Sequence, residues 1–380
     1  MNSDLDTRRG KDRALRGRPL LYTSYAADMA LLNTRAKRIA VGSLLLAGVA
    51  APFVLTDRTL GLLAICCVAA IGAIGLGLVT GYAGQVSLGH AFFLGIGAYT
   101  SAFVSGDPDG RTLGLGITNI LIWLPAAGLV ALLAGILVAP LATRLRGLYL
   151  AIVTLGLVFI GQHIFGEWHA LTGGTGVGRA PADLELFGYS IGAGDAIGTA
   201  QQKSFWLMFV LLAVFALAAR NVARSKVGRA FTAIRDRDIA AGVIGVNLAR
   251  YKTIAFAISS FYAGCAGALL YPLIGYIEPG SFSLLLSIQY IAMVLIGGAG
   301  TISGAIAGAF FITLLPSLTR ELQPLVPFIS TSATEMPNIF QVETILYGVL
   351  IIGFLIFEPR GLFGLWVRLR AYWKTWPFSY

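Results

Sequence analysis

Long apolar runs, separated by short polar or glycine-rich segments, dominate the chain of 380 residues. A helix that crosses the hydrocarbon core of a bilayer needs about 20 apolar residues. Runs that approach this length cover residues 39–55, 60–80, 81–100, 118–141, 147–165, 204–219, 253–277, 282–296, 297–316 and 344–357. The pattern predicts an all-α polytopic membrane protein with about ten transmembrane helices, or eight to eleven if the segments near residues 85 and 300 are re-entrant.

The composition supports a membrane protein. Hydrophobic residues make up 57% of the chain and charged residues only 12%, whereas about a quarter of a typical soluble domain is charged. Cys66, Cys67 and Cys265 lie inside apolar runs and form no C-x-x-C pattern, so we expect them to be packing residues. The spacing of His163 and His169 does not suggest a closed metal site, and we expect neither a metal nor a bound cofactor.

The 28 Lys and Arg residues are divided unequally between the two sides of the predicted membrane domain. One side, formed by segments 1–38, 144–146, 220–252 and 358–380, carries 23 of them, and the opposite side carries five. The positive-inside rule places the richer side, with both termini, in the cytoplasm. This topology explains the net charge of +10 without a nucleic-acid partner.

The expected organisation has three parts. They are a basic cytoplasmic N-terminal extension (1–38), a transmembrane domain (39–357) that contains a cytoplasmic loop (220–252) and an extracytoplasmic loop (166–203), and a basic cytoplasmic tail (358–380).

Two glycine-rich segments, 81–100 and 297–308, are poor continuous helices. Glycine costs about 1 kcal/mol per helical position relative to alanine, and a broken backbone persists in a membrane only where protein or a water-filled cavity satisfies it. We therefore expect both breaks to line a pathway. The candidate residues are Tyr82, Gly84, Gln85, Ser87, Gly89, His90, Gln289, Gly297, Gly298 and Gly300.

Within the first break, His90 is the ionisable residue. Ionisable residues inside apolar runs are functional candidates by default. An equally weighted alternative is that His90 satisfies the broken backbone near the membrane edge. Helix N-termini at Gly84 to Ser87 would also face an anionic group on a substrate.

The loop at 220–252 is the long charged segment between apolar runs. Residues 228–241 are compatible with a short amphipathic helix, with Phe231 and Ile234 on one face and Arg235 and Asp238 able to pair at i,i+3. Gly242 and Gly245 interrupt the helix. A solvated basic linker or a helix on anionic lipid is the alternative, but the mixed charges and the glycine stop favour a protein partner.

The residues of this loop carry a family resemblance. G-R-A-x-x-A-I-R-D-x-x-I-A-A-x-x-x-G-V-N, residues 228–247, resembles the cytoplasmic loop of the permeases of branched-chain amino acid ATP-binding cassette (ABC) importers, the LivH/LivM type. Ile239 stands where many ABC permeases have the glutamate of E-A-A-x-x-x-G. Segments 81–99, 145–155, 172–177 and 297–309 resemble further blocks of the LivM type in the same order, so the resemblance covers roughly residues 60–365.

The resemblance implies a permease subunit in a bacterial cytoplasmic membrane that imports branched-chain amino acids. It implies as partners two ABC ATPase subunits, a second LivH-like permease subunit and an extracytoplasmic substrate-binding protein, within the lipid bilayer. By resemblance, the residues that couple to the ATPase are Gly228, Arg229, Phe231, Ile234, Arg235, Asp236, Asp238, Ala240, Ala241, Gly245 and Asn247.

The sequence contains no Walker P-loop, so we expect ATP to bind to partner subunits and this chain not to be an enzyme. Three alternatives remain. A urea or amide ABC permease of the same family is one. An ion-coupled secondary transporter is disfavoured because no Asp or Glu lies in the middle of a confident span. A passive channel would leave the amphipathic helix of the loop without a clear use.

Overall fold

The computed structural model describes the chain except for residues 1–34, 146, 196–197, 323–338, 359 and 376–380. The expected N-terminal extension and the proline-containing segment 324–337 therefore lie almost wholly outside the described residues. The chain divides into two units, one formed by Met1–Ala47 with Leu365–Tyr380 and the other by Gly48–Gly364. All the candidate site residues belong to the second unit.

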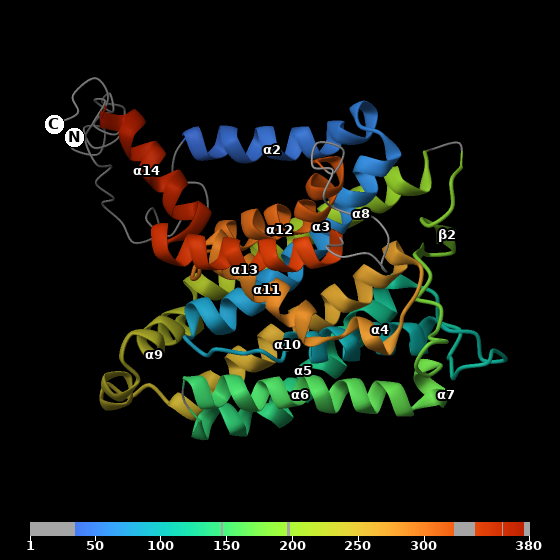
Figure 1. The fold of residues 1–380 in the computed structure, drawn as a ribbon, viewed down its shortest axis with the longest axis horizontal. Helices are drawn as coiled ribbons and strands as arrows, with labels where there is room; N and C mark the ends of the chain where they lie inside the picture. The colour runs from blue at the N-terminus through green and yellow to red at the C-terminus, as the bar shows by residue number, and fades with distance from the viewer. Residues whose placement is uncertain (1–34, 146, 196–197, 323–338, 359, 376–380) are drawn as a thin grey trace, which may run out of the picture. The chain divides into compact units, whose positions relative to one another are not determined.

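Each of the ten apolar runs forms a helix over most of its described length (Figure 1), and the runs 81–100 and 297–316 contain non-helical residues near their starts. The helices that these runs form are α2 (Arg35–Val54), α3 (Asp57–Leu76) with the π-helix η2 (Gly77–Tyr82), α4 (His90–Ser105), α5 (Ile120–Arg144), α6 (Leu148–Glu167), α8 (Ala200–Arg224), α10 (Leu248–Ile274), α11 (Leu284–Gly297), α12 (Ile302–Leu322) and α13 (Ile339–Phe357). Within the described part of the chain, seven helices are long and apolar enough to cross a membrane, with shorter apolar helices at Val41–Val54 and Thr344–Phe354. The all-α polytopic class is therefore confirmed.

The remaining elements lie between or after these runs. They are α7 (His169–Thr172), the strands β1 (Glu185–Leu186) and β2 (Tyr189–Ser190), α9 (Lys226–Val243), the 3-10 helix η3 (Pro279–Ser281) and α14 (Gly361–Thr375). The two strands pair antiparallel through Leu186 and Tyr189. Figure 1 shows α9 at one end of the helices of the larger unit and β2 with α7 at the other.

Helix α10 is the centre of the core and packs against α3, α4 and α5. Small residues allow this close approach. A Cβ atom added to Gly97 of α4 would overlap the backbone of Gly264 in α10, and a Cβ atom added to Gly264 would lie 2.8 Å from the carbonyl oxygen of Ala127 in α5. Small residues at helix interfaces are typical of membrane proteins, where close backbone packing replaces the hydrophobic effect between helices.

The spacing of Gly300, Gly304 and Gly308, at intervals of four residues, predicts one stripe of small residues on a helix face. The structure corrects this. Gly304 and Gly308 do pack in α12 against Gly297 of α11, but Gly300 precedes α12 and has a φ of +84°. Gly298 also has a positive φ, of +116°. These two glycines reverse the chain between α11 and α12, because positive φ values carry little cost for glycine alone.

Arg179 holds together the segment between α6 and α8. Its buried guanidinium donates hydrogen bonds to the carbonyl oxygens of Leu171 and Ala102, both at 2.6 Å, and of Leu113 at 3.2 Å. Its backbone pairs with that of Ile277, after α10. Burial lowers the pKa of Arg179 from its ordinary value, and the nearby Tyr99 acts in the opposite direction. The sequence showed Arg179 only as one of the few basic residues on its side.

Candidate functional site

The first glycine-rich break is a seven-residue interruption between two helices. The π-helix η2 ends at Tyr82, the next seven residues are not helical, and α4 begins at His90. The break itself is therefore confirmed. The expected helix N-termini at Gly84 to Ser87 are wrong, however, because the helix begins only after them, with Gly89 as its N-cap.

Hydroxyl groups of two other helices satisfy the backbone of this break. The amide of Leu88 donates to Thr154 Oγ1 of α6 at 2.9 Å, and the amide of Ala91 donates to Ser287 Oγ of α11 at 3.0 Å. Both hydroxyl residues are fully buried. A membrane interior has no water to replace these acceptors. Sequence reasoning missed both residues, although polar side chains inside the apolar runs 147–165 and 282–296 were the available signal.

His90 lies inside the protein in this conformation, with only 2% of its surface exposed. Its ring packs 4.8 Å from the ring of Tyr290, centroid to centroid, and its polar edge contacts the backbone of Gly72. The Nε2 atom has no hydrogen-bond partner among the described residues. The geometry thus places His90 at the packed start of α4.

Of the other nine pathway candidates, eight lie in or next to the two breaks, and Gln289 lies inside α11. Gln85, Ser87, Gly89, Gly297 and Gly298 are buried, Tyr82, Gln289 and Gly300 are partly exposed, and Gly84 is exposed. Gln85 donates its backbone amide to Val79 O at 2.9 Å and its side-chain amide to Ala83 O at 3.2 Å. In this conformation these residues mainly support the broken backbone. Their part in a translocation path stays a prediction.

The two glycine-rich breaks meet in space, although more than 200 residues separate them in the sequence. A Cβ atom added to Gly81 would overlap the backbone nitrogen of Gly300. The backbones of the two breaks are therefore in direct contact. Nothing in the pattern of apolar residues indicated this contact.

Helix α9 is the amphipathic helix expected between residues 228 and 241, extended by two residues at each end. The hydroxyl of Ser225 caps its start by accepting from the amide of Val227 at 3.1 Å. Its inner face is formed by buried residues, namely Gly228, Ala230, Phe231, Ile234 and Ala241. Of the coupling candidates, four are therefore buried on the inner face of α9, namely Gly228, Phe231, Ile234 and Ala241. Gly245 has a positive φ, of +90°, after the helix, and Asn247 caps α10.

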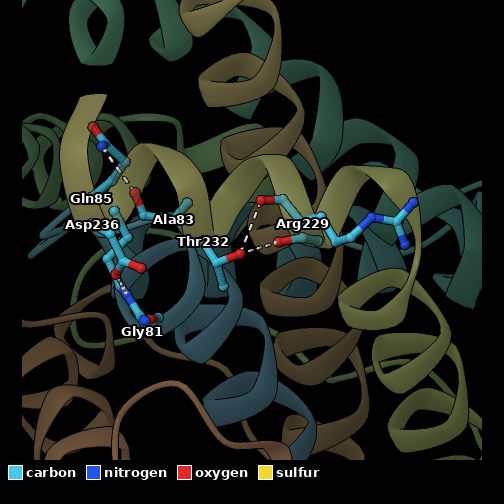
Figure 2. A network of polar contacts seen from close by, with 8 residues as sticks. Gly81, Ala83, Gln85, Arg229, Thr232 and Asp236 are labelled. Atoms are coloured by element: carbon cyan, nitrogen blue, oxygen red, sulfur yellow. Dashed lines mark hydrogen bonds and ion pairs between the residues drawn. The ribbon is translucent and has the colours of Figure 1, made fainter. Parts of the chain in front are cut away.

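Arg235 contacts the first break from α9. Its Nη1 atom donates to the carbonyl oxygen of Gly81 at 3.0 Å, and its Nε atom forms an ion pair with Asp236 Oδ1 at 3.0 Å. Figure 2 shows Gly81, Ala83 and Gln85 beside the part of α9 that carries Asp236. The expected helical i,i+3 geometry between Arg235 and Asp238 is wrong, because Arg237 interrupts the helix with a φ of −155° and a ψ of 96°.

A cavity of about 250 Å³ lies where α9 meets the first break. It combines residues from both candidate sets with the buried Lys252 of α10. The lining residues are Gly84, Gln85, Gly147, Ile234, Arg235, Asp236, Arg237, Asp238 and Lys252. The cavity is therefore strongly polar and carries both signs of charge.

The end of α9 beyond Arg237 exposes a cluster of apolar side chains. Ile239 is 71% exposed, Val243 83% and Ile244 75%. The neighbouring coupling candidate Ala240 is exposed too, as are Arg229, Asp236 and Gly242, while Asp238 is partly exposed. We call Ile239, Val243 and Ile244 the α9 apolar end. Exposed apolar clusters rimmed by polar residues mark interaction sites.

Comparison with known proteins matches most of the chain to one family. Residues 58–355 match the family model described as "Branched-chain amino acid transport system / permease component". The high-affinity branched-chain amino acid transport system permease proteins LivM of Escherichia coli (strain K12) and Salmonella typhimurium (strain LT2) are each 30% identical, over 87% of this chain and 76% of theirs. The autoinducer 2 import system permease protein LsrC of Enterobacter sp. (strain 638) is 29% identical over 50% of this chain and 55% of its own. No solved structure matches the chain significantly.

Proposed function

Because the chain belongs to the family of branched-chain amino acid transport system permease components, we propose that it imports branched-chain amino acids as the permease subunit of an ABC importer. The names of the LivM relatives support this substrate class over urea or amides. The observation that carries the proposal is α9, a short helix between two long apolar helices, with an exposed apolar end outside and contacts to both glycine-rich breaks inside.

The proposed partners follow from the two ends of the larger unit. The α9 apolar end is a docking surface for an ABC ATPase subunit, and the segment 166–203 at the opposite end faces the extracytoplasmic substrate-binding protein. The distribution of 23 basic residues against five supports a cytoplasmic position for α9 and both termini. A second LivH-like permease and a second ATPase subunit complete the importer, and ATP is hydrolysed on the ATPase subunits.

We propose that the two glycine-rich breaks are elements of the translocation path that open when the helices around them separate. The contact between Gly81 and Gly300 supports this, because the end of the π-helix η2 there meets the non-helical turn before α12, and such interruptions are places where packed helices can separate. His90, with its buried unpartnered Nε2 atom, becomes available to substrate in the opened state.

Introducing negative charge into the docking surface tests the proposal. We expect Val243→Asp combined with Ile244→Asp to abolish co-purification with co-expressed ATPase subunits and to abolish ATP-driven leucine uptake. Docking removes these two side chains from water, and an unpaired carboxylate at either position would oppose that burial. The matched control is Val243→Ile with Ile244→Val, which retains apolar side chains and should retain both activities.

The two side chains are exposed in the chain, so the aspartate variants should fold, which a monodisperse elution in detergent will confirm. Normal ATPase association and normal uptake by the aspartate variant would contradict the proposed docking role of α9.

A further inference from the structure

We propose that Arg235 is the positioning residue that transmits movement of α9 to both glycine-rich breaks at once. The inference rests on the proposed function, since it assumes that an ATPase moves α9. It identifies the side chain that carries this movement and the backbone groups that receive it.

The first line of evidence is that one side chain reaches three glycines from the two breaks. A Cβ atom added to Gly84 would lie 2.9 Å from Cγ and 3.1 Å from Cα of Arg235, so the arginine stem lies directly against the Gly84 backbone. The guanidinium donates to Gly81 O at 3.0 Å. A Cβ atom added to Gly300 would lie 3.0 Å from Nη1. Arg235, whose side chain is 40% exposed, therefore lies against the point where the two glycine-rich segments meet.

The second line of evidence is the chemistry of the contact. Gly81 lies in the last turn of η2, where carbonyl oxygens lack helical partners and the helix dipole favours a cation. A planar, permanently charged guanidinium suits this position, because its donors are arranged in a fixed fork. The Nε atom is oriented at the same time by Asp236. Asp236 thus holds the Nε atom of the guanidinium, and the carbonyl oxygen of Gly81 holds its Nη1 atom.

The third line of evidence is the position of Arg235 along α9. The half of the helix before it is anchored by the buried Phe231 and Ile234. The helix is interrupted two residues later, at Arg237, and the α9 apolar end follows the interruption. Arg235 therefore lies between the anchored half and the docking end. Displacement of the docking end bends α9 next to the residue that holds the breaks together.

The consequence for transport is a direct mechanical connection. Packed protein interiors transmit displacements because they compress little. Movement of Arg235 shifts Gly81 through the hydrogen bond and Gly300 through steric contact, so the ends of η2 and the start of α12 move together.

The test measures leucine transported per ATP hydrolysed by the complete importer in proteoliposomes. We expect Arg235→Gln to leave ATPase association within twofold of the parent protein and to lower this ratio at least tenfold. Arg235→Lys should restore it in part, since an ammonium can still donate to Gly81 O. The matched control is Lys226→Gln, at an exposed basic residue at the start of α9 that belongs to neither candidate set, and it should leave the ratio unchanged.

Three outcomes overturn the inference. A normal ratio for Arg235→Gln would remove the transmitting role and leave the permease function intact. Loss of ATPase association in Arg235→Gln would make the residue a docking contact. Equal losses in Arg235→Gln and Lys226→Gln would mean that the loss of a positive charge on α9, and not the contacts of Arg235, causes the effect. The proposed function fails separately, if the α9 apolar-end variants transport normally.

A double-mutant cycle adds an independent readout. Gly84→Ala should also lower the ratio, because the φ of +67° at Gly84 strains alanine and the new Cβ atom pushes on the Arg235 stem. The effect of Gly84→Ala should be clearly smaller in an Arg235→Gly background than in the parent, since residues in contact are non-additive. If Gly84→Ala lowered the ratio by the same factor in both backgrounds, the contact between Arg235 and Gly84 would not transmit the movement.

Discussion

Thr154 and Ser287 show how single hydroxyl groups maintain a broken backbone inside a membrane protein. Each is fully buried and accepts a hydrogen bond from the main chain at the end of the first break. Without these hydroxyls, the amides of Leu88 and Ala91 would be left without an acceptor in surroundings that lack water. The hydroxyls are therefore the reason that the chain can leave helix at Tyr82 and re-enter it at His90.

Thr154→Val tests this at the level of one atom, because it replaces the hydroxyl by a methyl group of similar size. We expect the free energy of unfolding to fall by about 1–3 kcal/mol, the usual cost of a buried donor without a partner. Thermal unfolding of the purified protein in detergent measures the change. Thr154→Ser retains the hydroxyl and is the control. If valine and serine variants are equally stable, the hydrogen bond to Leu88 does not support the break.

Single residues also mark the limit of prediction from the sequence. His90, Gln85 and the glycines of the first break were identified because a histidine and clustered glycines stand out in an apolar run. Thr154 was not, because one threonine in a long apolar run is ordinary. Helical spacing indicated that Arg235 could pair with Asp238, but the helix is interrupted at Arg237 and Arg235 forms an ion pair with the adjacent Asp236.

At the scale of elements, the predictable features are those set by local physics. The run 147–165 became α6 (Leu148–Glu167), and the amphipathic stretch 228–241 became α9 (Lys226–Val243). Such boundaries depend on the length of the apolar run, on N-caps such as Ser225 and Asn247, and on positive-φ glycines such as Gly245. Which helices touch depends on contacts between distant residues, and the approach of Gly81 to Gly300 was invisible for that reason.

The contact between α4 and α10 gives a prediction at this scale. Gly97→Ala should prevent stable folding or lower the melting temperature markedly, because the Cβ atom would overlap the Gly264 backbone of a helix that is itself packed on three sides. Gly156→Ala in α6 is the matched control, since no atom lies within 4 Å of its added Cβ. It should be at least as stable as the parent, because alanine favours helix over glycine. Similar effects of both substitutions would contradict the close packing.

At the scale of the whole molecule, the two ends of the larger unit are chemically different. One end carries α9, with its apolar end and mixed charges, and the other carries the hairpin β1–β2 and the segment organised by Arg179 (Figure 1). This polarity suits a protein that receives substrate on one side and energy on the other. The Lys and Arg distribution predicted the sidedness from sequence alone, whereas the connection through Arg235 needed the structure.

The most direct test of the account is uptake of radiolabelled leucine by proteoliposomes that contain this chain, its partner permease, the ATPase subunits and the substrate-binding protein. The account predicts uptake that requires ATP on the α9 side and binding protein on the opposite side, and that stops when the ATPase subunits are left out. Leucine uptake of equal rate without ATP or without the ATPase subunits would contradict it, and would identify the chain as a passive or ion-coupled pathway.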